Sequence, residues 1–249
     1  MMTVPRATYR LQLNKDFTFA HALALVPYLD DLGISHVYLS PILRAQPGST
    51  HGYDVCDVTR INPEVGTEAD LEVLVAALRE EGMGLVLDIV PNHMAVAREN
   101  PWWWDVLRNG RGSAFADCFD IDWDSPDPDL RGRVLLPVLG DELERVLDRG
   151  ELRLVCEAGE WMVAYFDHRY PVRPDTVPTP GEGMGAAPAG PDTDRLAMVR
   201  LLGQQHYQLA FWRHGDRRLN YRRFFTITDL AGVRVEVPEV FTQTHGRII

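Results

Sequence analysis

The chain has 249 residues, of which 45% are hydrophobic, and this size fits one α/β barrel or one domain that carries an insertion. Its 36 acidic and 25 basic residues give a formal charge of −11, which argues against a nucleic acid as partner. No apolar run approaches ~20 residues and the N-terminus lacks the apolar core of a signal peptide, so we expect no membrane partner and a cytoplasmic location. Three scattered cysteines predict reduced thiols.

The first 90 residues alternate between strand and helix patterns. Alternating apolar residues predict a strand over 8–13, and apolar residues at helical spacing follow over 19–32. Pro27 should kink or end that helix, because proline removes an internal hydrogen bond. A second strand is predicted over 34–39, and a polar loop over 44–53.

A third strand lies within 84–96, an aliphatic run that passes into polar residues. The preceding helix should begin at an imperfect capping box of Thr67 with Asp70 and end near Gly82. An aliphatic strand of this kind is typical of a parallel sheet covered on both faces, and the regular ladder should stop near Pro91. The predicted fold class is therefore α/β, with right-handed βαβ units of the kind that build a (β/α)8 TIM barrel, of which three strands are visible here.

The strand and helix rhythm breaks after His93, which predicts a large insertion after the third strand. We expect the first three βα units at 1–93, the inserted subdomain at 94–218 and a return to the third barrel helix at 219–249. Smaller expected features are a hairpin of 153–157 with 161–166, a mobile Pro/Gly loop at 177–191, helical periodicity over 194–212, and a final helix from Pro238 to Ile249.

Two groups of polar residues follow the second and third strands, where the loops of a barrel converge on one rim. They are His51, Tyr53 and Asp54 after the second strand and Asp88, Asn92 and His93 after the third. An aromatic ring beside carboxylates and a histidine suits a sugar, because the C–H face of a pyranose packs on the ring. The other interpretation is that these residues only satisfy turns, with a half-buried tyrosine.

The order of these motifs resembles the α-amylase family of glycoside hydrolases, and most closely its maltooligosyltrehalose synthase branch. The family signatures are seen in the segments 32–41, 51–54 and 88–93, and the segments typical of the branch are 8–12, 135–140, 165–168 and 220–225. The resemblance covers nearly the whole chain. It implies that Tyr53 stacks on the sugar at the cleavage subsite and that His93 hydrogen-bonds the hydroxyls of that sugar.

The resemblance also implies roles for the neighbouring residues. Asp54 and His51 join the substrate-binding set, Asp88 and Asn92 support it, and neither a metal nor another cofactor is expected. The family's nucleophile and general acid would lie beyond Ile249, so no catalytic residue is expected in this chain, which resembles an N-terminal fragment.

The implied activity is intramolecular transglucosylation of a maltooligosaccharide in trehalose biosynthesis. The α-1,4 bond at the reducing end becomes an α,α-1,1 bond, and this chain alone would be inactive. The alternatives are a non-catalytic α-glucan-binding chain that needs a separate C-terminal chain, or an amylase-type hydrolase. Arg222 and Arg223 stand beside aromatic residues and could bind sugar hydroxyls or pair with the acidic surface.

Overall fold

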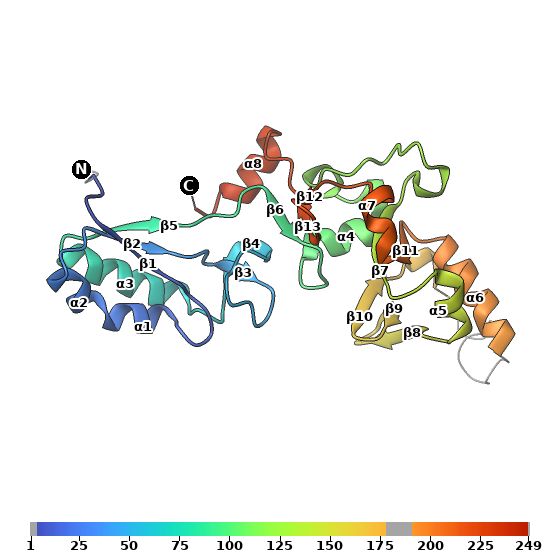
Figure 1. The fold of residues 1–249 in the computed structure, drawn as a ribbon, viewed down its shortest axis with the longest axis horizontal. Helices are drawn as coiled ribbons and strands as arrows, with labels where there is room; N and C mark the ends of the chain where they lie inside the picture. The colour runs from blue at the N-terminus through green and yellow to red at the C-terminus, as the bar shows by residue number, and fades with distance from the viewer. Residues whose placement is uncertain (1–3, 178–190, 249) are drawn as a thin grey trace. The chain divides into compact units, whose positions relative to one another are not determined.

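The computed structural model describes residues 4–177 and 191–248, and the chain divides into two compact units. The first unit comprises Met1–Ala95 and Val235–Ile249, and the second comprises Val96–Arg234. Figure 1 labels the helices and strands of both units. Nearly all of the expected Pro/Gly loop at 177–191 lies outside the described residues.

The first unit contains a parallel sheet of three strands in the order β1-β2-β5. These strands are β1 (Thr8–Leu11), β2 (His36–Leu39) and β5 (Gly84–Leu87). In the register of the sheet Leu39 lies opposite both Leu11 and Leu87. Parallel neighbours need long crossover connections, and here helices supply them. The three strands predicted from the sequence and their βαβ order are confirmed, and within the described residues they do not close a barrel.

The helices of the first unit begin and end where the sequence chemistry requires. The predicted helix over 19–32 is divided into α1 (Phe19–Ala24) and α2 (Val26–Asp31), with Pro27 in the first turn of α2, where its missing N–H removes no internal bond. In α3 (Glu68–Glu80) the capping box is confirmed: the Thr67 hydroxyl accepts from the Asp70 N–H at 3.2 Å, and the Asp70 carboxylate accepts from the Thr67 N–H at 2.8 Å.

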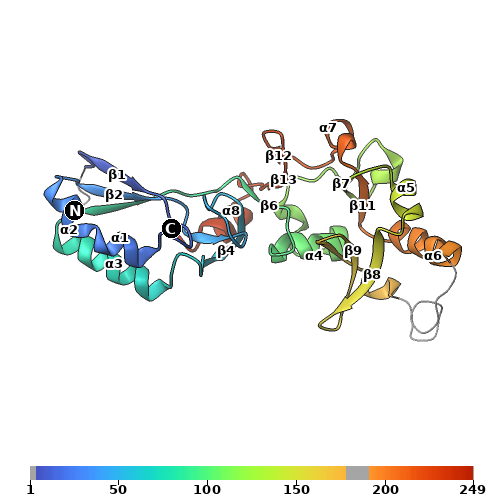
Figure 2. The same cartoon turned by 60° about the horizontal axis from the view of Figure 1, so that its bottom comes forward.

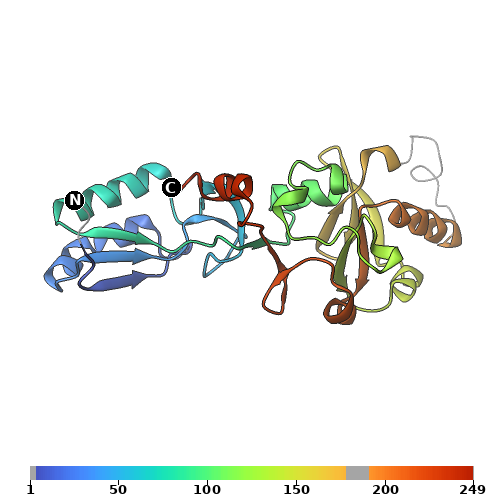
Figure 3. The same cartoon turned by 90° about the horizontal axis from the view of Figure 1, so that it is seen from above.

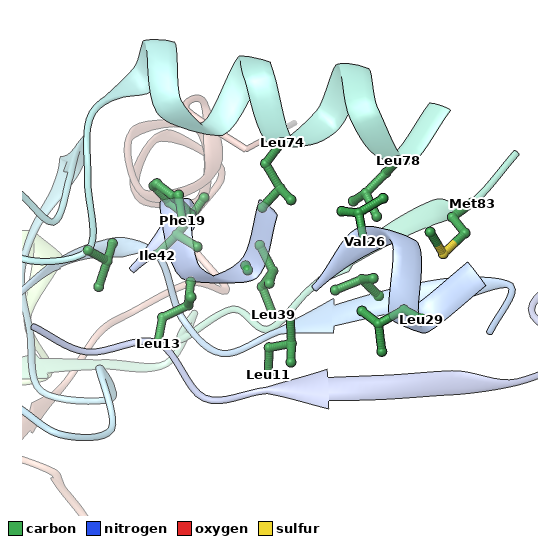
Figure 4. Packing of buried hydrophobic residues seen from close by; sticks show 13 residues of the cluster. Leu11, Leu13, Phe19, Val26, Leu29, Leu39, Ile42, Leu74, Leu78 and Met83 are labelled. Atoms are coloured by element: carbon green, nitrogen blue, oxygen red, sulfur yellow. The ribbon is translucent and has the colours of Figure 1, made fainter. Parts of the chain in front are cut away.

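One face of the sheet packs against these helices and forms the core of the unit. Figures 2 and 3 show α1 and α3 next to each other on this face, and Figure 4 shows the packed side chains. The buried members include Leu11, Leu13, Phe19, Leu29, Leu39, Leu74 and Leu78. Leu11 and Leu13 are alternate residues of the first strand segment, which explains the period of two in the sequence.

The opposite face of the sheet carries polar groups. Arg10, Tyr38 and Val86 share one row of the register, and the Arg10 guanidinium lies over the Tyr38 ring at 5.4 Å from its centroid. Nearer the start of the strands, His36 lies opposite Gly84, and its buried ring packs against this glycine. A Cβ atom at residue 84 would collide with the His36 ring. The expectation that β5 is covered on both faces is wrong for the described residues: β5 is an edge strand and each of its residues is only partly buried.

A small antiparallel pair completes the first unit together with β6 (His93–Ala95) and α8 (Pro238–His245). The pair is β3 (Leu43–Ala45) with β4 (Val55–Ile61), so the predicted loop over 44–53 begins too early. The final helix starts at Pro238 as predicted but ends at His245, before Ile249. The following Arg247 forms an ion pair with Glu68 at the start of α3.

The second unit combines short sheets with separate helices. Its strands are β7 (Val134–Leu139), β8 (Leu152–Glu157), β9 (Glu160–Tyr165), β10 (His168–Pro171), β11 (Tyr207–Phe211), β12 (Arg223–Phe224) and β13 (Ile227–Gly232). Its helices are α4 (Pro101–Asn109), α5 (Leu143–Asp148), α6 (Pro191–Gly203) and α7 (Gly215–Arg218), with short 3-10 helices at Gly110–Gly112, Ala116–Cys118, Pro128–Leu130, Pro174–Thr176 and Trp212–His214.

The predicted hairpin is confirmed: β8 pairs antiparallel with β9 across Ala158 and Gly159, whose φ angles of 51° and 83° are those of a tight hairpin turn. The prediction of helical periodicity over 194–212 is wrong after Gly203. Residues of β11 pair in parallel with β7 instead, with Leu209 opposite Leu136. The pairing with β7, a strand that is distant in sequence, therefore decides the structure of these residues in spite of their helical spacing.

The second unit ends at Arg234, beyond the boundary at 218 inferred from the sequence. The buried Asn220 side chain explains this, because it accepts from the Leu135 N–H at 2.9 Å and donates to the Arg133 carbonyl at 2.7 Å. The two arginines of open role are paired with acidic residues: Arg222 with Asp120 at 2.8 Å and Arg223 with Asp216 at 3.0 Å.

Candidate functional site

Three segments of the first unit meet at the hydroxyl group of Tyr53. This hydroxyl donates a hydrogen bond to Asp88 Oδ2 and accepts one from Arg10 Nη2 at 3.1 Å. Arg10 Nη2 also lies 3.4 Å from Asp88 Oδ2. Asp88 follows β5 directly, Arg10 belongs to β1, and Tyr53 lies in the loop between β3 and β4. The structure thus brings Tyr53 and Asp88 together at the carboxyl end of the parallel strands, as the sequence predicts.

The charges in this cluster fix the direction of the hydrogen bonds. The hydrogen bond to Asp88, and next the burial of the ring, raise the pKa of Tyr53 above its ordinary value of 10.0. Burial alone would lower the pKa of Arg10, but its hydrogen bonds with Tyr53, Tyr38 and Asp88 outweigh this and raise it. At neutral pH the phenol is therefore protonated and donates a hydrogen bond to the Asp88 carboxylate, which orients the Tyr53 ring.

Arg10 and Gln12 are site residues that the sequence reasoning missed. Gln12 Oε1 accepts from Arg10 Nη1 at 2.7 Å, and Gln12 Nε2 lies 3.2 Å from the Thr50 carbonyl and 3.3 Å from the His51 carbonyl. Gln12 thereby connects the first strand to the loop that carries Tyr53. The sequence pattern that could have found them is the alternation along the first strand, which places these two polar residues on the face opposite the buried Leu11 and Leu13.

The loop around Tyr53 is built on internal hydrogen bonds. Gly52 has φ of 77° and donates its N–H to Ser49 Oγ at 3.1 Å, and a Cβ at this glycine would lie 3.0 Å from the Pro41 carbonyl oxygen. Ser49 Oγ in turn donates to the Asp54 carboxylate. Asp54 is thus occupied in holding the loop, and only glycine fits both the dihedral angle and the space at Gly52.

His51 is exposed and lies next to the Tyr53 ring. Its Nδ1 accepts from the Tyr53 N–H at 3.0 Å, and the two ring centroids are 6.0 Å apart with an interplanar angle of 23°. The backbone N–H of Tyr53 is therefore satisfied by the neighbouring imidazole. The two rings form an aromatic pair on the loop between β3 and β4.

His93 is buried, with 3% of its surface exposed, and supports the Tyr53 backbone. Its Nε2 lies 3.0 Å from the Tyr53 carbonyl oxygen, and its Nδ1 lies 2.8 Å from Asn92 Oδ1. Burial lowers the pKa of His93, although the bond to the Tyr53 carbonyl opposes that effect. Both ring nitrogens thus face oxygen atoms of the protein, and a neutral ring, with its one N–H, donates to one of them. The expected contact of His93 with a sugar hydroxyl stays a prediction.

The depressed pKa of His93 predicts a pH dependence of stability. The unfolded histidine binds a proton near its ordinary pKa of 6.5, whereas the folded side chain binds it only at lower pH. The free energy of unfolding should therefore fall as the pH drops from 7 through 6.5 toward the folded pKa. A His93→Gln variant should show a smaller decrease in urea titrations at pH 7, 6 and 5. The exposed His21 on α1 provides the control variant His21→Gln, and equal slopes for all three proteins would contradict the assignment.

Within residues 4–177 and 191–248 no group of three or more His, Cys, Asp or Glu side chains is placed to hold a metal ion. Over the same residues, no helix combines the length and the apolar character that crossing a membrane requires.

Comparison with known proteins shows which family the chain resembles. The alpha-amylase catalytic domain family matches residues 23–129. A Mycobacterium tuberculosis H37Rv protein named "Putative maltooligosyl trehalose synthase" is 45% identical, with 97% of this chain and 28% of that protein covered. The solved structure of maltooligosyltrehalose synthase from Arthrobacter ramosus is 43% identical with a TM-score of 0.81, covering 98% of this chain and 29% of that one.

A hypothetical maltooligosyl trehalose synthase from Sulfolobus tokodaii gives a TM-score of 0.79 at 32% identity, over 99% of this chain and 30% of that one. The chain thus spans less than a third of the length of each of these relatives. These matches cover 97–99% of this chain and so extend over both of its units. The chain is therefore a homologue of the maltooligosyl trehalose synthases of the alpha-amylase family, corresponding to the N-terminal part of those proteins.

Proposed function

We propose that this chain supplies part of the α-glucan site of a maltooligosyltrehalose synthase, the enzyme that converts a reducing-end α-1,4 bond into an α,α-1,1 bond. The observation that carries the proposal is the Tyr53 ring, which Asp88 and Arg10 hold by its hydroxyl at the carboxyl end of a parallel sheet. The 45% identity with the Mycobacterium tuberculosis relative supports it.

The arrangement around Tyr53 suits a neutral sugar. Because Asp88 and Arg10 hold the hydroxyl, the Tyr53 ring is already oriented before a sugar binds, and binding does not have to include the entropy loss of ordering a free side chain. An aromatic face packs against the C–H groups of a pyranose, while neighbouring polar groups bind its hydroxyls. The exposed His51 and the side chains of Asp54 and Asn92 are the nearby polar groups in this proposal, and His93 supports the loop from below the surface.

The proposed reaction needs two carboxyl groups. One attacks the anomeric carbon and binds the rest of the chain as a glycosyl enzyme while the other protonates the oxygen of the departing glucose, and the pair stands ~5–5.5 Å apart in a retaining enzyme. The anomeric hydroxyl of the departed glucose then attacks the same carbon, gives its proton to the second carboxyl group and displaces the first, so no water is consumed. Asp54 and Asp88 both accept hydrogen bonds from protein groups. The family resemblance gives both of them supporting roles, and on that ground we place the nucleophile and the acid outside these 249 residues.

A second candidate function is that of a chain that binds α-glucan without catalysis and needs a separate chain for activity. The hydrogen-bonded state of both local carboxylates favours it. An amylase-type hydrolase shares the first chemical step and differs in its product. Hydrolysis releases glucose or maltose, whereas rearrangement gives a non-reducing product with a trehalose end. Product analysis separates these two enzymes.

Binding of maltopentaose tests the role of Tyr53. Tyr53→Ala should weaken binding to this chain by roughly tenfold, about the 1.4 kcal/mol expected for the loss of one stacking platform and its water exclusion. The matched control is Tyr28→Ala on α2, because Tyr28 is 56% exposed and belongs to the same unit. Chemical-shift titration by NMR gives the dissociation constants. A similar loss in both variants, or none in Tyr53→Ala, would remove the basis of the proposed site.

A further inference from the structure

The second unit contains a hollow of about 390 Å³ whose lining includes Arg131, Arg133, Arg173 and His206. Arg133 immediately precedes β7 and His206 immediately precedes β11. These strands are parallel with Val134 opposite Tyr207, and the Val134 N–H donates to the His206 carbonyl at 2.9 Å. The pairing therefore brings Arg133 and His206 side by side at the amino ends of the two strands.

Backbone carbonyl groups at the end of α6 hold two of these arginines. Arg133 donates to the Gly203 carbonyl, and Arg173 Nη1 donates to the Gln204 carbonyl at 3.1 Å. The carboxyl end of a helix attracts cations, so this position also stabilises the guanidinium groups. A carbonyl bond does not neutralise their charge, however, and a guanidinium has five N–H donors. Arg133 uses one of its five donors on Gly203, whereas Arg173 uses three, two on the Asp175 carboxylate and one on the Gln204 carbonyl, which leaves two for a ligand.

A buried glutamine makes the arrangement rigid. Gln205 is 2% exposed, and its Oε1 accepts from the Arg173 N–H at 2.9 Å. Its Nε2 donates to Thr176 Oγ1 at 3.1 Å and to the Leu201 carbonyl at 2.7 Å. The turn that carries Arg173 is thereby fixed to the end of α6, and the arginine does not have to be ordered when a ligand binds.

The hollow is positively charged in an acidic protein. Across the described ranges, the carboxylate paired with these arginines is that of Asp175, which contacts Arg173 at 3.1 and 2.6 Å. Three arginines and one aspartate give the lining a formal charge of +2, against −11 for the whole chain. The pKa of His206 is lowered by burial first and then by the charges of Arg173 and Arg133, and the charge of Asp175 opposes this only in part.

We propose that Arg131, Arg133 and Arg173 form a binding site for a phosphate monoester in the second unit. The lining charge of +2 complements a phosphate dianion, and guanidinium groups match phosphate oxygens with paired N–H donors. The volume lies in the usual range for small-molecule sites and exceeds the need of one phosphate group. A phosphorylated sugar is therefore a suitable ligand class. The site is separate from the residues around Tyr53 and does not depend on their role.

Calorimetric titration of the whole chain with glucose 6-phosphate and with inorganic phosphate, at constant ionic strength, tests this site. Saturable binding is expected, and comparing the two probes shows whether the ligand is a monoester or the free anion. Arg133→Gln should weaken binding by about tenfold or more, since it removes a charge-assisted contact. The matched control is Arg153→Gln, which removes the same charge from an exposed position on β8 of the same unit.

Arg131→Gln provides a second variant with little risk to folding, because Arg131 is exposed and only its Nε lies near a carbonyl, that of Ser125 at 3.4 Å. It too should weaken binding. In NMR titrations the pKa of His206 should rise when the anion is bound, because the anion offsets the neighbouring positive charge. An absence of saturable binding, an equal loss in Arg153→Gln, or an unchanged His206 pKa would each show that the arginines only stabilise the end of α6.

Discussion

Maltopentaose incubated with the purified 249-residue chain is expected to remain intact, with neither a trehalose-ended product nor glucose formed. Cleavage with retention requires a nucleophile and an acid on the two sides of one anomeric carbon. Asp54 is held by Ser49, and Asp88 is held by Tyr53 and Arg10. Losing one catalytic group commonly lowers the rate by several orders of magnitude, so the chain should not approach the rate of a complete enzyme.

Chromatography of the reaction mixture measures both products, and a full-length homologue serves as the positive control. The informative variant is Asp88→Ala. Turnover by the chain alone that disappears in this variant would make Asp88 a catalytic carboxylate and would contradict its supporting role. Activity that appears only when a separate C-terminal chain is added would favour the two-chain alternative.

Trp103→Ala is expected to lower the free energy of unfolding of the second unit by about 3–5 kcal/mol, as measured for large aromatic residues removed from cores. Trp103 is 1% exposed. Its ring contacts Phe119 edge-on, with centroids 5.0 Å apart, and Tyr221 at 5.3 Å. The substitution would leave a cavity between α4 and the segments that carry these two rings, and the surrounding structure would fill it only in part.

Urea titration followed by far-UV circular dichroism measures this loss, and Trp212→Ala is the control because that ring is 57% exposed. Trp103→Phe should cost much less than Trp103→Ala. The phenyl ring keeps most of the contacts, and the indole N–H that it removes has no hydrogen-bond partner among the described residues. Equal transition midpoints for Trp103→Ala and Trp212→Ala would show that the indole is not important for the packing.

Local chemistry explains which parts of the fold the sequence predicts. The capping box at Thr67, the break at Pro27 and the hairpin turn at Ala158 all depend on residues within a few positions of each other. The strand β11 was missed because its pairing with β7 joins segments more than 60 residues apart, and its apolar residues also fit a helical spacing. The boundary at Arg234 was missed for the same reason, since the contacts of Asn220 are distant in sequence.

The candidate site was predictable to a similar degree. The meeting of Tyr53 with Asp88 follows from parallel strands whose ends share one edge. The burial of His93 did not follow, because only the folded loop shows that both of its ring nitrogens lie against protein groups. Arg10 was hidden for another reason. Its polar character resembled an exposed strand position, and its role emerges only when the β3 and β4 loop is placed beside β1.

The hydroxyl of Tyr53 joins three segments that are far apart in the sequence, and this affects how the protein can diverge. Loss of Asp88 would leave the Tyr53 hydroxyl and the Arg10 guanidinium without the carboxylate that both contact. The first replacement within this trio should therefore cause most of the loss in stability. A second replacement within the trio would then cost less than it does in the intact protein. Arg10, Tyr53 and Asp88 should therefore be epistatic, and lineages should keep or exchange them as a group.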